Sequence, residues 1–227
     1  MSESGEAPVA GWRRWLLIAV VALGIAGLAF AIGRFSTFGS TSSVVTPSTT
    51  SADAGFARDM QVHHAQAIDM AMEIYRTTDD EELRILAYDI ATSQAEQKGQ
   101  MYDWLVKWGL SQSGGPLMSW MTSSDGGHDH GGSTTGEAPT EEELRVAMGM
   151  ASPDELTALR DASGPAADCL FLELMIRHHQ GAIPMADALL DLGTDPRARA
   201  VAEAMKNGQT AEIAAMESMQ SRLQCTG

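Results

Sequence analysis

Apolar residues recur at steps of three and four along four long segments of the chain, which is the pattern of amphipathic helices. The segments cover about residues 53–75, 79–108, 164–192 and 196–223. Gly109 and Gly193 follow the second and third segments, and Pro196 begins the fourth, as is common at helix ends and helix starts. The sequence therefore predicts four long helices and an all-α fold.

Capping patterns locate further helix starts. Thr78 or Asp79 is expected to cap the second long helix. Two shorter helices are expected to begin near residues 141 and 153, because Thr140 and Ser152 are each followed three residues later by a glutamate. Between residues 110 and 140 the pattern has no sustained period, so this stretch is predicted to be a long inserted loop.

The first and third long segments contain two copies of one pattern. Residues 56–70 and 171–185 share Phe, Met, His-His, Ala, Ile and Met at matching places, at a constant offset of 115. The offset continues into the second and fourth segments, where three residues recur: Ala87, Gln94 and Met101 as Ala202, Gln209 and Met216. Each copy is therefore a helix pair, and two helix pairs are expected to enclose a core as a four-helix bundle.

Residues 15–32 form an apolar run without a charge, preceded by Arg13 and Arg14. We expect this run to be an uncleaved transmembrane anchor with the rest of the chain outside the cytoplasm. The alternative is a cleaved secretory signal, with a small-x-small site at residues 29–31. The expected organisation is listed in order: a cytoplasmic tail and anchor (1–34), a flexible Ser/Thr-rich linker (35–52), and the bundle (53–227) with its inserted loop (110–140).

Net charge and cysteine content indicate which classes of partner and which cellular compartment suit this chain. The formal net charge of −15 argues against nucleic acid, which needs a basic patch, and agrees with a solvated acidic surface. The two cysteines, Cys169 and Cys225, fall near neighbouring ends of the third and fourth helices. They predict a disulfide in an oxidising compartment, with a thiol copper site as the alternative.

The histidine pairs and their methionines are the candidate metal ligands. Neighbouring histidines diverge by about 100° around a helix, so one ion is expected to take one His from the first helix and one from the third. Imidazole with thioether sulfur selects copper, Cu(I) above all, or another soft metal such as Ag(I). The first-rank ligands are His63, His64, His178, His179, Met60, Met70, Met175 and Met185. The second-rank ligands are His128, His130, Met118, Met121, Met148 and Met150.

Two other interpretations remain open at this point, and a third is disfavoured. The methionines fill a core and the histidines are satisfied by buried hydrogen bonds, in which case the domain is an interaction module that docks on a membrane complex. An oxidoreductase that uses bound copper or iron is the enzymatic alternative. A di-iron site is disfavoured, because Met60 and Met175 stand where Glu-x-x-His motifs need glutamate. With unperturbed histidines, metal affinity would fall between about pH 7 and about pH 5.

The repeated Met-x-x-His-His pattern, at Met60–His64 and Met175–His179, resembles the DUF305 family. The resemblance covers about residues 53–223, and the segment from Met148 to Leu156 is similar to the form common in actinobacteria. It implies a ferritin-like four-helix fold. It also implies, more loosely, copper binding outside the cytoplasm in sequestration or delivery, without enzymatic activity. The protein partner is left undetermined.

Overall fold

The computed structural model describes residues 46–121 and 138–225. The chain divides into a unit of residues 1–45 and a unit of residues 46–227, and the described residues all belong to the second. The predicted anchor at residues 15–32 lies outside the described residues. In the described part of the chain, no helix is both long enough and apolar enough to cross a membrane.

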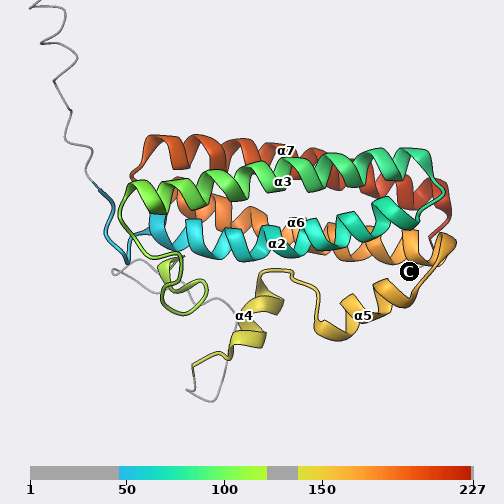
Figure 1. The fold of residues 1–227 in the computed structure, drawn as a ribbon, viewed down its shortest axis with the longest axis horizontal. Coiled ribbons are helices and arrows are strands. Elements are labelled where there is room, and N and C mark those ends of the chain that lie inside the picture. The colour runs from blue at the N-terminus through green and yellow to red at the C-terminus, as the bar shows by residue number, and fades with distance from the viewer. Residues whose placement is uncertain (1–45, 122–137, 226–227) are drawn as a thin grey trace, which may run out of the picture. The chain divides into compact units, whose positions relative to one another are not determined.

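Four long helices form the bundle (Figure 1). They are α2 (Ala52–Thr77), α3 (Glu81–Lys107), α6 (Gly164–Leu192) and α7 (Pro196–Leu223). Helix α2 packs against α3, α6 packs against α7, and the two pairs meet where α2 contacts α6. The described residues contain helices and no strands, so the predicted all-α bundle of two helix pairs is confirmed.

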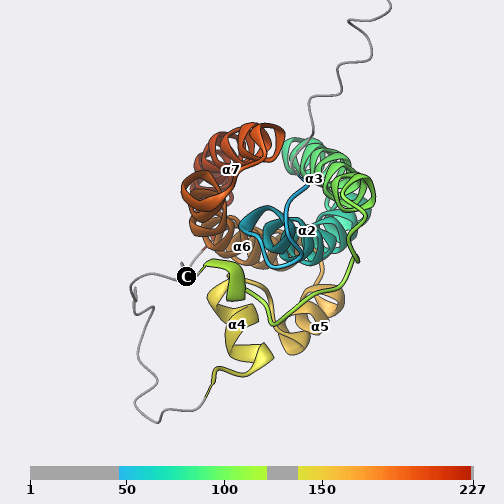
Figure 2. The same cartoon turned by 90° about the vertical axis from the view of Figure 1, so that its left-hand side faces the viewer.

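Two short helices and a single 3-10 turn complete the described residues. They are α4 (Glu141–Ala147), α5 (Pro153–Asp161) and η1 (Ser119–Met121). Viewed along the bundle, α4 and α5 lie on the side formed by α2 and α6, away from α3 and α7 (Figure 2). The bidentate ion pair of Arg177 with Glu155, at 2.8 and 2.7 Å, fastens α5 to α6.

Most helix starts agree with the capping patterns, with one exception. Thr140 and Ser152 both form the predicted capping boxes. Helix α3, however, is capped by Asp80, whose carboxylate accepts a hydrogen bond from the Leu83 N–H at 2.9 Å. The prediction of Thr78 or Asp79 as this cap is wrong, because Thr78 instead accepts a hydrogen bond from the Asp80 N–H within the turn. The Asp80 cap follows the repeat, since Asp195 caps α7 in the same way.

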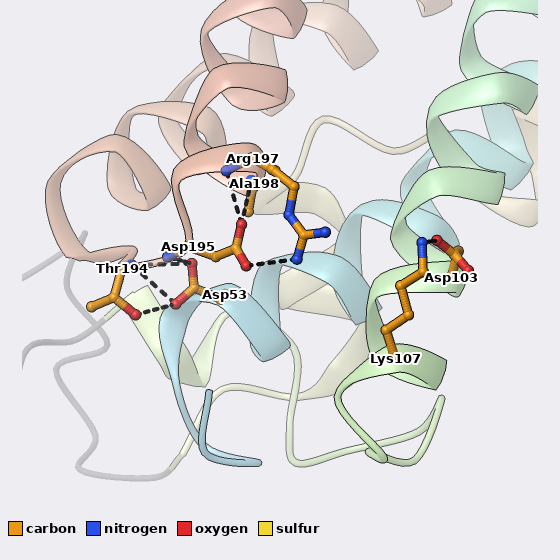
Figure 3. Close-up of polar contacts among 7 residues, drawn as sticks. All are labelled: Asp53, Asp103, Lys107, Thr194, Asp195, Arg197 and Ala198. Atoms are coloured by element: carbon orange, nitrogen blue, oxygen red, sulfur yellow. Dashed lines mark hydrogen bonds and ion pairs between the residues drawn. The ribbon is translucent and has the colours of Figure 1, made fainter. Parts of the chain in front are cut away.

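The start of α2 is fastened to the turn between α6 and α7. The buried Asp53 carboxylate accepts hydrogen bonds from the Thr194 N–H, the Thr194 hydroxyl and the Asp195 N–H, all at 2.9–3.1 Å (Figure 3). Three donors on one carboxylate fix the end of the α6–α7 pair against the first helix. The contact sets the register in which α2 and α6 run side by side.

The core consists of two apolar clusters, one towards each end of the bundle. On α2 the first cluster ends at Met60 and the second begins at Ala67. On α6 the buried apolar residues up to Met175 belong to the second cluster, and those from Ala182 onwards belong to the first. Both histidine pairs therefore lie between the two apolar clusters, at the middle of the bundle.

Cys169 and Cys225 form a disulfide, as predicted.

The segment before α2 differs from the prediction of a flexible linker. The last residues of the expected linker, from Thr46 to Ser51, belong to the folded unit. The reason is Arg58, a buried guanidinium that donates to the Thr49 carbonyl at 2.7 Å and to the Ser111 carbonyl at 3.0 Å. The chain is thus ordered before α2 begins.

Candidate metal centre

His63 on α2 and His178 on α6 stack across the contact between the two helix pairs. Their ring centroids are 3.6 Å apart and the planes are tilted by 33°. Within each pair the rings diverge, with centroids 6.3 Å apart for His63 and His64 and also for His178 and His179. The structure confirms the prediction that histidines from two different helices come together, and all four rings are fully buried.

Five nitrogens of these rings are buried without a hydrogen-bond partner. They are Nδ1 of His63, His64, His178 and His179, and Nε2 of His178. The remaining three nitrogens have partners: the Met148 carbonyl for His63 at 3.0 Å, the Gln97 amide oxygen for His64 at 2.8 Å, and the Glu212 carboxylate for His179 at 2.7 Å. Because a buried polar atom without a partner is costly, these five nitrogens are the candidate donors to a bound ion or water.

The tautomers follow from these partners. A carbonyl and an ionised carboxylate only accept, so Nε2 of His63 and Nε2 of His179 carry the proton. Their Nδ1 atoms then carry the lone pair and are buried without a partner. Such nitrogens are the form of imidazole that binds a metal ion.

Burial favours the neutral form of His63, His64 and His178. It lowers the pKa of His63 to about 3 and that of His64 to about 4, and the positive charge of the neighbouring histidines adds to the effect. Burial also lowers the pKa of His178 far below its usual value. Protons are therefore expected to compete with a metal ion for His63 and His64 at a lower pH than they would for unperturbed histidines. The loss of affinity between pH 7 and pH 5, which assumed unperturbed histidines, stays a prediction.

A strap formed by residues 148–151, between α4 and α5, crosses the histidine stack. His63 donates to the Met148 carbonyl, and the Gln66 side chain makes a double hydrogen bond to the Ala151 backbone at 2.7 and 2.9 Å. The strap also lies close to the α6 backbone. Gly149 adopts a φ of +72°, and a Cβ at this position would lie 2.3 Å from the Arg177 carbonyl oxygen. It covers one side of the stack, which explains why His63 has a partner and its repeat equivalent His178 has none.

Gly181 makes this close approach possible. A Cβ at this position would lie 2.0 Å from the Met148 carbonyl oxygen. We expect Gly181→Ala to lower the free energy of unfolding by about 2 kcal/mol or more, because backbone must move to relieve the clash. The matched control is Gly208→Ala on α7, where a Cβ would meet nothing within 4 Å and the helix gains about 1 kcal/mol. Urea denaturation of both variants measures the difference, and equal stabilities would contradict the role of Gly181.

The methionines surround the histidines from both sides. The buried ones are Met60, Met70, Met101, Met148, Met150, Met175, Met185, Met205, Met216 and Met219. Each apolar cluster contains one member of each repeated pair: Met60, Met101 and Met185 in the first, and Met175, Met216 and Met70 in the second. All four first-rank methionines thus lie in the clusters that adjoin the histidines.

The second-rank residues separate into three groups. Met148 and Met150 belong to the strap and are buried in the first cluster. Met118 and Met121 lie at η1, only partly buried, against the same cluster. There the Met118 N–H and the Trp120 indole N–H both donate to the buried Asp59 carboxylate, which gives this turn a structural role. His128 and His130 lie outside the described residues.

Three residues that contact the histidines or the strap were not predicted from the sequence to do so. Gln97 and Glu212 hold Nε2 of His64 and Nε2 of His179, and Gln66 holds the strap. The available signal was the repeat itself, since positions 97 and 212 are related by the same offset of 115 as the histidines.

The chemistry available at this place is that of a soft cation. In the described ranges, no group of three or more His, Cys, Asp or Glu side chains is arranged to hold a metal ion. Neutral imidazole nitrogens and buried thioether sulfurs are what the residues at this place offer, and those donors suit Cu(I) or Ag(I).

Comparisons with known proteins identify the family and the fold. The profile of the family described as "Domain of unknown function (DUF305)" matches residues 53–220. No curated protein matches the chain. A secreted DUF305 protein from Streptomyces coelicolor is similar in structure, with 36% identity, a TM-score of 0.66, and coverage of 79% of this chain and 96% of that one.

Two further structures extend the comparison. A DUF305 fragment from Deinococcus radiodurans has 32% identity and a TM-score of 0.60, and covers 75% of this chain and 96% of its own. CopM in its Cu(I)-bound form has 25% identity and a TM-score of 0.54, over 75% of this chain and 96% of its own. CopM in its Cu(II)-bound form is similar to the same extent, with 26% identity and a TM-score of 0.54.

Proposed function

This chain belongs to the DUF305 family, and from that premise we propose that it binds copper as Cu(I), and the chemically similar Ag(I), at the buried histidines between α2 and α6. The observation that carries the proposal is the set of five partnerless ring nitrogens at the middle of the bundle. The copper-bound forms of CopM, a structural relative, support the choice of metal.

The donors fit the ion for a physical reason. Cu(I) prefers soft and borderline ligands, and the histidine layer is bounded on both sides by buried methionines. Water is excluded from all four rings, so a bound ion gains its ligands without competition from solvent. Burial also favours the neutral, metal-binding form of His63 and His64 at neutral and mildly acidic pH.

The biological role that we infer is sequestration or delivery of copper outside the cytoplasm. The Cys169–Cys225 disulfide supports an oxidising compartment, where thioether ligands survive better than thiolates. We propose that residues 15–32 anchor the domain to the membrane. Labelling with a membrane-impermeant amine reagent in intact cells tests the side on which the domain lies.

The deciding experiment is a titration of the purified chain with Cu(I), under anaerobic conditions, against a competing Cu(I) chelator. We expect the chain to compete with a dissociation constant of micromolar or tighter, and saturation with Cu(I) to raise its melting temperature. Zn(II) at the same concentration serves as the comparison ion, and we expect it to bind more weakly because thioether is a poor ligand for it. No competition with the chelator would remove the proposal.

A further inference from the structure

His64 and His179 occupy the same place in the two repeats, and so do the side chains that hold them. Gln97 and Glu212 are separated by the same 115 residues as the two histidines. The two contacts have nearly the same length, 2.8 Å from His64 to the Gln97 amide and 2.7 Å from His179 to the Glu212 carboxylate. Both rings are fully buried with Nδ1 lacking a partner. The two halves therefore differ by one chemical group, an amide against a carboxylate.

This difference fixes one tautomer and leaves the other undetermined. An ionised carboxylate only accepts, so His179 must carry its proton on Nε2 and present a lone pair at Nδ1. An amide presents either its oxygen or its NH₂ group to a ring, so Gln97 stabilises either tautomer of His64. A carboxylate behind an imidazole also makes its other nitrogen a stronger donor to a metal.

The electrostatic surroundings of the two halves differ in the same direction. Beside His64, Lys98 on α3 contributes a positive charge to the surroundings of the ring. The repeat equivalent of Lys98 is the neutral Ile213. A cation that approaches His64 meets an amide and an ammonium, whereas a cation that approaches His179 meets a carboxylate.

We propose that Glu212 is a positioning residue that makes the His179 half of the centre the side where Cu(I) binds first and more tightly. This inference rests on the proposed function. It deepens that proposal by assigning an order to two halves that the repeat makes look equivalent. The His64 half, with Gln97, takes metal second and more weakly.

The test compares Glu212→Gln, which gives both halves an amide, with Gln97→Glu, which gives both halves a carboxylate. Nitrogen-15 NMR of the histidine rings in the metal-free chain reads the tautomers directly. We expect His179 to be protonated on Nε2 alone in the unchanged chain and to become a mixture in Glu212→Gln. His64 is expected to be a mixture that becomes the Nε2-protonated form in Gln97→Glu.

Cu(I) is the probe for the second measurement. The first added equivalent is expected to shift the His179 resonances before those of His64 in the unchanged chain. Glu212→Gln should lower the affinity of this first step by about 10- to 100-fold, and Gln97→Glu should raise the affinity of the second step. If Glu212→Gln does not fold, the Gln97→Glu result decides the inference alone.

The outcomes separate the two proposals. If the unchanged chain binds Cu(I) but Glu212→Gln changes the affinity by less than about two-fold and leaves the tautomers unaltered, only this inference is overturned. Simultaneous shifts of His64 and His179 at the first equivalent overturn it as well. If the unchanged chain binds no Cu(I), the proposed function and this inference both fall.

Discussion

Replacement of His178 by leucine is expected to stabilise the metal-free protein while it removes high-affinity Cu(I) binding. Both ring nitrogens of His178 are buried without a partner, and each such group costs about 1–3 kcal/mol. An apolar side chain of similar size removes that cost and keeps the core filled, so the free energy of unfolding should rise by about 1–2 kcal/mol. Chemical denaturation of the metal-free protein measures this change.

His178→Leu should lower the Cu(I) affinity more than the substitution of a residue that only hydrogen-bonds a metal ligand, such as Glu212. Such outer changes cost about 10- to 100-fold, so the loss of a ring that binds the metal should cost at least about 100-fold in the Cu(I) titration. A variant that is more stable but binds less metal separates a binding role from a structural one. A simple core histidine would give the opposite sign for stability.

His63→Leu is the matched control for this prediction. His63 lies against His178 in the same stack, but its Nε2 donates to the Met148 carbonyl. The same substitution there leaves a buried carbonyl without its donor, which costs about 1–3 kcal/mol and offsets the gain from removing the partnerless Nδ1 of His63, so the free energy of unfolding should not rise as it does in His178→Leu. If both leucine variants lose the same stability, and Cu(I) does not raise the melting temperature of the unchanged chain, the histidines are structural and the docking-module interpretation is favoured.

The stability of the metal-free protein is expected to fall steeply as the pH drops from about 6.5 towards about 4. In the unfolded chain the histidines bind protons near pH 6.5, whereas burial lowers the pKa of His63 to about 3 and that of His64 to about 4. Between these values the unfolded state binds more protons than the folded state, so acid favours unfolding. Each histidine that stays neutral contributes a loss of about 1.4 kcal/mol per pH unit.

The measurement is the free energy of unfolding in urea at several pH values between 7.5 and 4.5. Burial also lowers the pKa of His178, so His178→Leu should reduce the slope by about one proton. Carboxylates such as Asp59, whose pKa is raised by burial, are present in both proteins and cancel in the difference. Saturating Cu(I) should hold the protein folded to lower pH, since it binds only the folded arrangement. Equal slopes for the two proteins would contradict the assignment of neutral, buried rings.

The sequence by itself determined the features that depend on short-range periodicity and on the repeat. The four long helices follow from apolar residues at helical spacing. The capping boxes at Thr140 and Ser152 involve residues only three positions apart, and the local pattern was enough to predict them. Helical geometry was enough to predict that one histidine of the first helix meets one of the third, because neighbouring histidines diverge around a helix; the structure shows that these two are His63 and His178.

Only the tertiary structure decided what each ring nitrogen contacts. The partners of His64 and His179 lie 33 residues further along the chain, on the second helix of each pair, and the Met148 carbonyl that His63 contacts lies 85 residues away. No local pattern specifies such contacts. The strap breaks the symmetry of the repeat, since it lies on one side of the bundle and needs Gly181 and Gln66 at equivalent positions of the two copies. The lowered pKa values of His63 and His64 also depend on the tertiary structure, because the burial of an imidazole is set by the assembled core and not by the neighbouring residues in the chain.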